Sequence, residues 1–152
     1  MKVLFEGPPD EILLKCLGVK ATKDGRHKSG VLKELTKREG LVGLVDEDPK
    51  NTQSRPKTMN EFRFIEKKLA VELYRHRDND NYLIVLCPDL ESWIIKAAKM
   101  SKVDLDLFNL PKKASALHNI INSRLSNTER LINELVVRKN PAVLYLQSLL
   151  LP

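Results

Sequence analysis

Short apolar runs alternate with amphipathic stretches along the first half of the chain. Residues 3–5 are apolar, as in a short buried strand, and this run ends at Glu6 and Gly7. Residues 8–17 then begin with two prolines and carry apolar side chains at helical spacing. The pattern therefore predicts a strand, a glycine turn and a helix at the start of the chain.

The alternation continues through the next thirty residues. Residues 19–22 predict a short second strand, and Ser29 is expected to cap a helix that ends at Gly40. Residues 41–45 contain no polar side chain, which is typical of a central parallel strand that is buried on both faces. This predicted strand runs directly into Asp46.

Two further strands are expected to pair as a hairpin. Apolar and polar residues alternate over residues 69–74, and residues 82–86 form another apolar run. The polar residues 77–81 between them predict a turn. A helix that begins at Pro88 is expected to follow, with Trp93 on its buried face.

The last third of the sequence is predicted to be helical. Helices are expected over residues 114–123, 127–138 and 142–150. Together with the strands, they predict an α/β fold with a central, mostly parallel sheet flanked by helices. We expect an α/β core over residues 1–100 and a helical extension over residues 101–152 that packs on the same domain.

The composition is that of one globular domain. The chain has 152 residues, 42% of them hydrophobic, and no apolar run approaches the ~20 residues that span a bilayer. Cys16 and Cys87 form no CxxC pair, so buried thiols are expected rather than a disulfide framework or a structural zinc site. The amino-terminal apolar run is too short for a signal peptide, and a cytoplasmic location is expected.

Acidic residues follow two of the predicted strands. Glu6 follows residues 3–5, and Asp46 and Asp48 follow residues 41–45. Ligands of open α/β sheets bind outside the carboxyl ends of the strands, so parallel neighbours would bring these carboxylates together. Carboxylate oxygens suit Mg²⁺ or Mn²⁺, which can stabilise the charge on a phosphoryl group. The alternative is that the aspartates are turn residues and Glu6 is a strand-end charge facing water.

Basic residues flank these acids in the sequence, and the net charge is +6. A positive surface attracts polyanions, so nucleic acid is the expected partner; a solvated basic surface is the alternative. Several bases precede the helix capped by Ser29, and a helix N-terminus can bind phosphate. The residues expected to contact phosphate or nucleic acid are Lys23, Arg26, His27 and Lys28.

The order of these features resembles the Toprim domain, with Glu6 after the first strand and an Asp-x-Asp motif at Asp46 and Asp48 after the third. Topoisomerases, bacterial primases and nucleases of the overcoming-lysogenisation-defect type share that fold. The resemblance implies that Glu6 acts as a general acid or base and that both aspartates bind Mg²⁺. It covers about residues 2–49 and, beyond them, at most the strand at residues 82–86.

One acid of the family pattern is missing. Many Toprim domains extend the motif to Asp-x-Asp-x-Glu, but this sequence has Lys50 at the last position. Glu91, which follows the strand at residues 82–86, is the candidate replacement for this metal ligand. Its alternative role is a charge at a helix N-terminus. A degenerate family member without catalysis is therefore a competing interpretation.

The leading hypothesis is Mg²⁺-dependent phosphodiester chemistry on nucleic acid by a small nuclease-like protein. The competing hypothesis is a non-catalytic module that binds nucleic acid or a protein partner through its basic surface and C-terminal helices. A small-molecule phosphotransfer enzyme is the third alternative. Residues 149–151 would support a homodimer if they are exposed, and their burial in the core is the alternative. From the sequence alone, the question whether the chain is an enzyme stays open.

Overall fold

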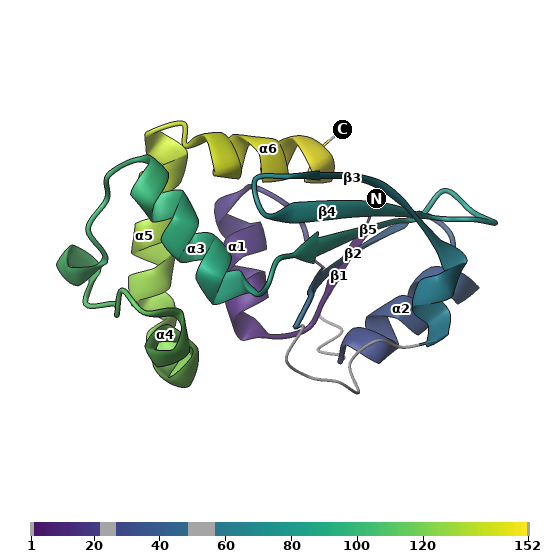
Figure 1. Ribbon diagram of the computed structural model, residues 1–152, viewed down its shortest axis with the longest axis horizontal. Helices are drawn as coiled ribbons and strands as arrows, with labels where there is room; N and C mark the ends of the chain where they lie inside the picture. The colour runs from purple at the N-terminus through teal and green to yellow at the C-terminus, as the bar shows by residue number, and fades with distance from the viewer. Residues whose placement is uncertain (1, 22–26, 49–56, 152) are drawn as a thin grey trace. The chain divides into compact units, whose positions relative to one another are not determined.

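The computed structural model is an α/β structure that contains a five-stranded mixed sheet (Figure 1). It describes residues 2–21, 27–48 and 57–151. The chain divides into two compact units, which we call the sheet unit and the helical unit. The sheet unit consists of Met1–Gly7 and Lys20–Asp89, and the helical unit of Pro8–Val19 and Leu90–Pro152.

The sheet has a parallel half and an antiparallel half. In sheet order, the strands are β1 (Lys2–Phe5), β2 (Leu41–Asp46), β5 (Tyr82–Leu86), β4 (Val71–His76) and β3 (Phe62–Lys68). β2 pairs in parallel with both β1 and β5, whereas β4 pairs antiparallel with both β5 and β3. The expectation of a mostly parallel sheet is therefore wrong, because half of the strand pairings are antiparallel.

The strands agree with the sequence pattern except at two places. β4 and β5 form the predicted hairpin. β3 is absent from the prediction because it is an edge strand that exposes every residue after Phe62, so no alternation of apolar and polar positions marks it. The strand expected at residues 19–22 is reduced to one parallel bridge between Val3 and Ala21, and Thr22 lies outside the described residues.

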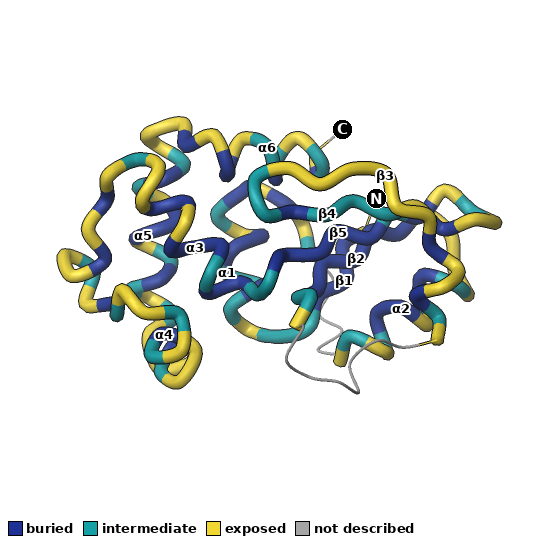
Figure 2. The backbone as a smooth tube through the Cα atoms, in the orientation of Figure 1, coloured by how far each residue is buried: buried dark blue, intermediate teal, exposed yellow. Residues whose placement is uncertain are grey.

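Helix α2 (Lys28–Lys37) packs on β1 and β2 and closes the core of the sheet unit. Figure 2 shows β1, β2 and β5 as largely buried strands. Met59 reaches this core from a short 3₁₀ helix, η1 (Lys57–Glu61). The core residues are Leu4, Val31, Leu32, Leu35, Leu41, Val45, Met59, Phe62, Leu83, Val85 and Cys87.

The start of α2 differs from the expectation. The helix begins at Lys28 with His27 as its N-cap, so the expected cap at Ser29 is wrong. The side chain of His27 makes no capping hydrogen bond. Gly40 has a φ of +75° and connects the end of α2 to β2, in a left-handed conformation that glycine adopts without strain.

Gly43 lets α2 pack closely on β2. A Cβ atom at Gly43 would lie 2.8 Å from both Leu35 Cδ1 and Val31 Cγ1. Carbon atoms in contact lie about 3.5–4.0 Å apart, so a side chain here would have to displace these buried methyl groups. The absence of a side chain at Gly43 therefore lets α2 approach the middle of β2.

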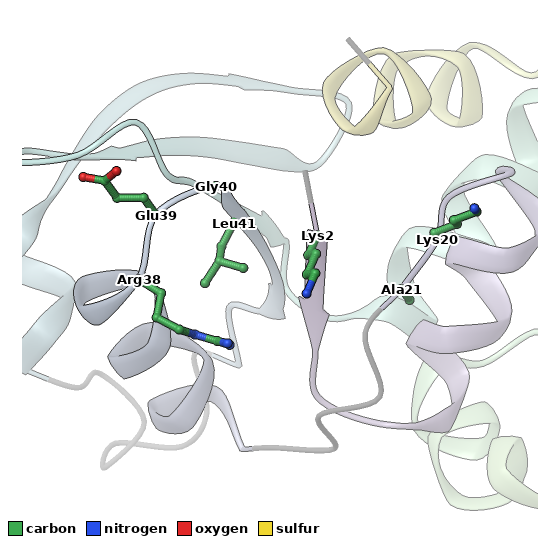
Figure 3. A pocket seen from close by; sticks show the side chains of 7 residues that line it. All are labelled: Lys2, Lys20, Ala21, Arg38, Glu39, Gly40 and Leu41. Atoms are coloured by element: carbon green, nitrogen blue, oxygen red, sulfur yellow. The ribbon is translucent and has the colours of Figure 1, made fainter.

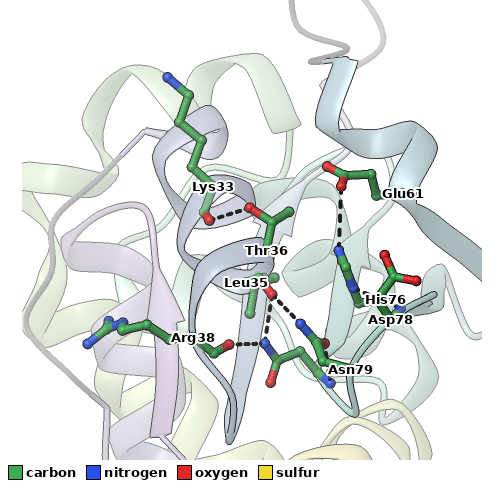
Figure 4. Close-up of polar contacts among 9 residues, drawn as sticks. Lys33, Leu35, Thr36, Arg38, Glu61, His76, Asp78 and Asn79 are labelled. Carbon is green, nitrogen blue, oxygen red and sulfur yellow. Dashed lines mark hydrogen bonds and ion pairs between the residues drawn. The ribbon is translucent and has the colours of Figure 1, made fainter.

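The turn between β4 and β5 holds the end of α2 (Figure 4). Asn81 is fully buried, and its Nδ2 donates to the carbonyl oxygens of Leu35 at 2.7 Å and Arg38 at 2.5 Å. Its Oδ1 accepts from Leu41 N at 2.9 Å. Asn79 Nδ2 also donates to Leu35 O, at 3.0 Å. The turn thereby satisfies carbonyl groups that the last turn of a helix leaves unpaired.

The helical unit contains five α-helices among its described residues. They are α1 (Pro8–Cys16), α3 (Leu90–Met100), α4 (Ala114–Ile120), α5 (Leu125–Val137) and α6 (Pro141–Leu150). Two short 3₁₀ helices, η2 (Leu105–Phe108) and η3 (Ile121–Ser123), lie between them. All the predicted helices are present, although the one expected at residues 114–123 changes from α to 3₁₀ after Ile120.

Helix α1 packs with the C-terminal helices of this unit. Lys15 Nζ forms an ion pair with Glu129 Oε1 on α5 at 2.9 Å. Gln147 Nε2 on α6 donates to Leu17 O at 3.1 Å. The helix that follows the first strand is thus part of the helical unit, so the compact units follow other boundaries than the expected division after residue 100.

Individual side chains lie largely where the sequence places them. Trp93 is only 1% exposed, which confirms its predicted core position. Cys87 is buried and Cys16 is half-buried, and both are free thiols. Within the described part of the chain, every helix is too short or too polar to cross a bilayer.

Replacing Asn81 by alanine should lower the free energy of unfolding by about 2–4 kcal/mol, because three hydrogen bonds disappear and buried backbone groups lose their partners. Urea unfolding of wild type and variant measures this difference. Asn133→Ala, at an exposed position of α5, is the matched control and should change stability by less than about 0.5 kcal/mol. Equal stabilities of Asn81→Ala and the control would contradict a central role for this turn.

Candidate functional site

Glu6 and Asp46 lie side by side where two parallel strands end. The register pairs Phe5 of β1 with Leu44 of β2, so both strands reach the same sheet edge. Glu6 Oε1 accepts a hydrogen bond from Asp46 N at 3.0 Å. The expectation that the two strands are parallel neighbours is confirmed, and Glu6 reaches the backbone at Asp46. The convergence of the three carboxylates at this edge stays a prediction.

The segment that follows β2 is fixed by hydrogen bonds from two sides. Glu47 N donates to Leu86 O and Asp48 N donates to Pro88 O, both at 2.9 Å. Lys28 Nζ, at the start of α2, donates to Glu47 O at 3.0 Å. Asp48 has a φ of 51°, a left-handed conformation that aspartate tolerates better than most residues. Hydrogen bonds therefore anchor the backbone of the Asp-x-Asp segment to the end of β5, to Pro88 and to α2, and the left-handed Asp48 also fits the alternative role of a turn residue.

The electrostatic environment of Glu6 favours its protonated form. Burial raises the pKa of the Glu6 carboxyl above its ordinary value of 4.5, and the negative charge of Asp48 raises it further. The hydrogen bond from Asp46 N and the positive charges of Lys28 and His27 lower this pKa but do not cancel the effect of burial. Glu6 is thus a half-buried carboxyl group whose proton is held more tightly than in water.

Of the four expected phosphate contacts, the structure describes only His27 and Lys28, and other basic residues gather at the opposite end of the sheet. His27 and Lys28 lie at the start of α2 and act on the charge of Glu6. Lys20 instead lines an open hollow of about 500 Å³ with Lys2 and Arg38, beside the starts of β1 and β2 (Figure 3). The remaining two expected phosphate contacts, Lys23 and Arg26, lie outside the described residues.

Glu91 belongs to the helical unit and has its own partner there. It lies in the first turn of α3 and is buried. Its Oε1 lies 3.1 Å from His118 Nδ1, within hydrogen-bonding distance. Its position at a helix N-terminus agrees with the alternative role expected from the sequence. Its role as a third metal ligand stays a prediction, and Lys50 lies outside the described residues.

A different group of potential metal ligands is the most compact one in the described part of the chain. Ligand atoms of Glu47, Glu72 and Cys87 all lie within 4.8 Å of one another, a criterion that Glu6, Asp46 and Asp48 do not meet as a trio. Sequence reasoning missed this group. The three residues come from the ends or interior of three strands, and no spacing along the chain signals that they meet.

Replacing Glu6 by glutamine tests the effect of burial. Because the folded-state pKa of Glu6 lies above its unfolded value, the stability that it contributes at acidic pH is lost as the pH rises from about 4.5 through the raised pKa. Glutamine keeps the oxygen that accepts from Asp46 N but has no charge. The variant should therefore be more stable than wild type at neutral pH and lose less stability on going from acidic to neutral pH.

Urea unfolding at a series of pH values measures this difference, with the exposed Glu39→Gln as the control that should keep the wild-type profile. A Glu6→Gln variant that is less stable at neutral pH and keeps the wild-type pH profile would contradict this description of the site.

Comparison with protein-family models, with curated proteins and with solved structures finds no match for this chain. The structure shows an α/β fold with a mixed sheet. The Toprim-like identity stays a prediction that depends on the Glu6 and Asp-x-Asp motifs.

Proposed function

We propose that the protein carries out Mg²⁺- or Mn²⁺-dependent phosphodiester chemistry on nucleic acid, as a nuclease-like enzyme, at the edge formed by Glu6, Asp46 and Asp48. The observation that carries the proposal is the hydrogen bond between Glu6 Oε1 and Asp46 N, because it joins the two halves of the motif across neighbouring strands. The carboxyl edge of a parallel sheet is where α/β proteins commonly bind ligands.

The donor atoms suit the proposed ion. The edge offers carboxylate oxygens, which Mg²⁺ and Mn²⁺ prefer. Because the three carboxylates do not all meet within 4.8 Å, we assign the ion to Asp46 and Asp48 and leave Glu6 outside its ligand set. When bound, such an ion supplies charge stabilisation to a phosphoryl group.

Glu6 has the properties of a general acid or base. A carboxyl group is most effective in proton transfer when its pKa approaches the working pH, and burial raises the pKa of Glu6 in that direction. The hydrogen bond from Asp46 N holds one oxygen in place. In our proposal, the other oxygen exchanges a proton with the attacking water or the leaving group.

The start of α2 is the proposed phosphate contact. The N-terminus of a helix carries partial positive charge and unpaired N–H groups, which bind anions. His27 is exposed there, and Lys28 lies close enough to Glu6 to affect its pKa. Lys28 uses one N–H to hold Glu47 O, which leaves its other donors for a phosphate oxygen.

A non-catalytic module is the second candidate function. The hollow lined by Lys2, Lys20 and Arg38, and by the one acid Glu39, places net positive charge away from the acidic edge, where it could bind a polyanion without a metal ion (Figure 3). Nucleic-acid binding that survives in chelator, with no cleavage in Mn²⁺, would favour this function over the first.

Replacing Asp46 and Asp48 together by asparagine should abolish cleavage of nucleic acid. It should also weaken Mn²⁺ binding by more than the ~10- to 100-fold that follows loss of a group that only orients a metal ligand. Calorimetric titration of Mn²⁺ and a nuclease screen with single- and double-stranded DNA and RNA measure the two effects. The melting temperature in metal-free buffer should not fall.

The chain offers a matched control in a second Asp-x-Asp sequence, Asp104 and Asp106, where both carboxylates already pair with Lys112. The double substitution to asparagine there should leave Mn²⁺ binding and cleavage unchanged. Equal losses in the two double variants would contradict the assignment of the metal to Asp46 and Asp48.

Replacing Lys28 by methionine should weaken nucleic-acid binding and reduce the slope of log K against log salt by about one, as expected for the loss of one phosphate contact. Fluorescence anisotropy at several salt concentrations measures this slope. Lys33→Met, an exposed position on the same helix, is the control. A salt slope that changes only in the control would contradict a phosphate contact at Lys28.

A further inference from the structure

A thiol and two carboxylates from three strands or strand ends lie close together, and one of the carboxylates belongs to the middle residue of the Asp-x-Asp segment. Cys87 directly follows β5, Glu72 lies in β4, and Glu47 directly follows β2. Their ligand atoms all lie within 4.8 Å of one another, and Cys87 Sγ donates to Glu72 Oε1 at 3.3 Å. Cys87 N donates to Ala70 O at 2.9 Å, which fixes the backbone at the thiol.

This cluster concentrates negative charge in a partly desolvated place. Cys87 is 4% exposed, and both glutamates are half-buried. No ion pair within the described residues involves Glu47 or Glu72. Two carboxylates close together repel each other, and partial burial strengthens that repulsion. Lys67, which is paired with Glu72 in the β3–β4 register, places a positive charge near the thiol but forms no ion pair with either glutamate within the described residues. A bound cation would compensate the remaining negative charge.

The hydrogen bond from the thiol explains only part of the arrangement. It gives Glu72 a partner, but within the described residues the Glu47 carboxylate beside the same thiol has no ion pair. Burial and both carboxylates raise the pKa of Cys87 to about 12, although the charge of Lys67 opposes this.

We propose that Cys87, Glu47 and Glu72 bind a divalent cation of the zinc class. Zn²⁺ and Co²⁺ accept thiolate sulfur and carboxylate oxygen together, in a small tetrahedral site, whereas Mg²⁺ takes oxygen ligands only. On binding, the Cys87 S–H bond is replaced by a sulfur–metal bond, and the proton is released to solvent. This inference differs from the expectation of inert buried cysteines without a zinc site.

The proposed ion would tie the Asp-x-Asp segment to the rest of the sheet unit. Glu47 lies between Asp46 and Asp48, so a metal bond to Glu47 would link this segment to β4 and to the end of β5 (Figure 1). The site shares no ligand with the proposed Mg²⁺ site. It therefore does not depend on the proposed function, and either proposal can fail without the other.

Titration of the metal-free protein with Co²⁺ tests the site, because tetrahedral Co²⁺ bound to thiolate gives a near-ultraviolet charge-transfer band and strong visible bands. We expect a saturable band at one Co²⁺ per chain that Zn²⁺ displaces. Cys87→Ser should abolish the charge-transfer band, and Glu72→Gln should weaken Co²⁺ binding at least tenfold. Circular dichroism checks that each variant is folded.

Two controls separate this site from others. Cys16→Ser removes the other thiol of the chain, which donates to Glu129 O, and should leave the band unchanged. Asp46→Asn/Asp48→Asn should also keep it. The proposal is overturned if wild type gives no thiolate band, if the band follows Cys16, or if Glu72→Gln binds Co²⁺ as tightly as wild type. Loss of the band in the double aspartate variant would likewise overturn it.

Discussion

The close packing of α2 on Gly43 is the constraint on which the sheet unit depends. Because Gly43 has no side chain, Val31 and Leu35 of α2 reach the backbone of β2. The helix then runs along the strand with its start near the carboxyl edge, where Lys28 holds Glu47 O. Gly43 thus permits the close packing of the helix whose first residue, Lys28, reaches the candidate site.

The carboxyl edge concentrates groups that are costly to fold. Burial raises the pKa values of Glu6 and Cys87, and Glu47 and Glu72 lie together without an ion pair among the described residues. Such groups lower stability unless a proton or a cation compensates them. Titratable groups with shifted pKa values cluster at functional sites, so this edge is the part of the sheet unit most suited to chemistry. Backbone hydrogen bonds at this edge, such as the one from Glu47 N to Leu86 O, hold these groups in position.

The pattern of apolar and polar residues predicted the elements whose formation depends on nearby residues in the sequence. The apolar run before Glu6 and the one before Asp46 became parallel neighbours, because a short apolar segment must be buried and a helical connection makes adjacent strands parallel. Long-range contacts were beyond this reasoning. The ion pair of Lys15 with Glu129, which belongs to the packing of α1 on α5, joins residues more than a hundred positions apart. The cluster around Cys87 needs three strands in register, which no single spacing reveals.

The central proposal is that Asp46 and Asp48, at the sheet edge beside Glu6, bind a divalent metal ion. Paramagnetic broadening of backbone amide signals by a small amount of Mn²⁺ tests it most directly in the ¹⁵N-labelled protein. The account predicts that the amide signals of Gly7 and Asp46 broaden first, while those of Gly40 and Asp106 stay sharp. Selective broadening around Asp106, or uniform weak broadening without a preferred site, would contradict it.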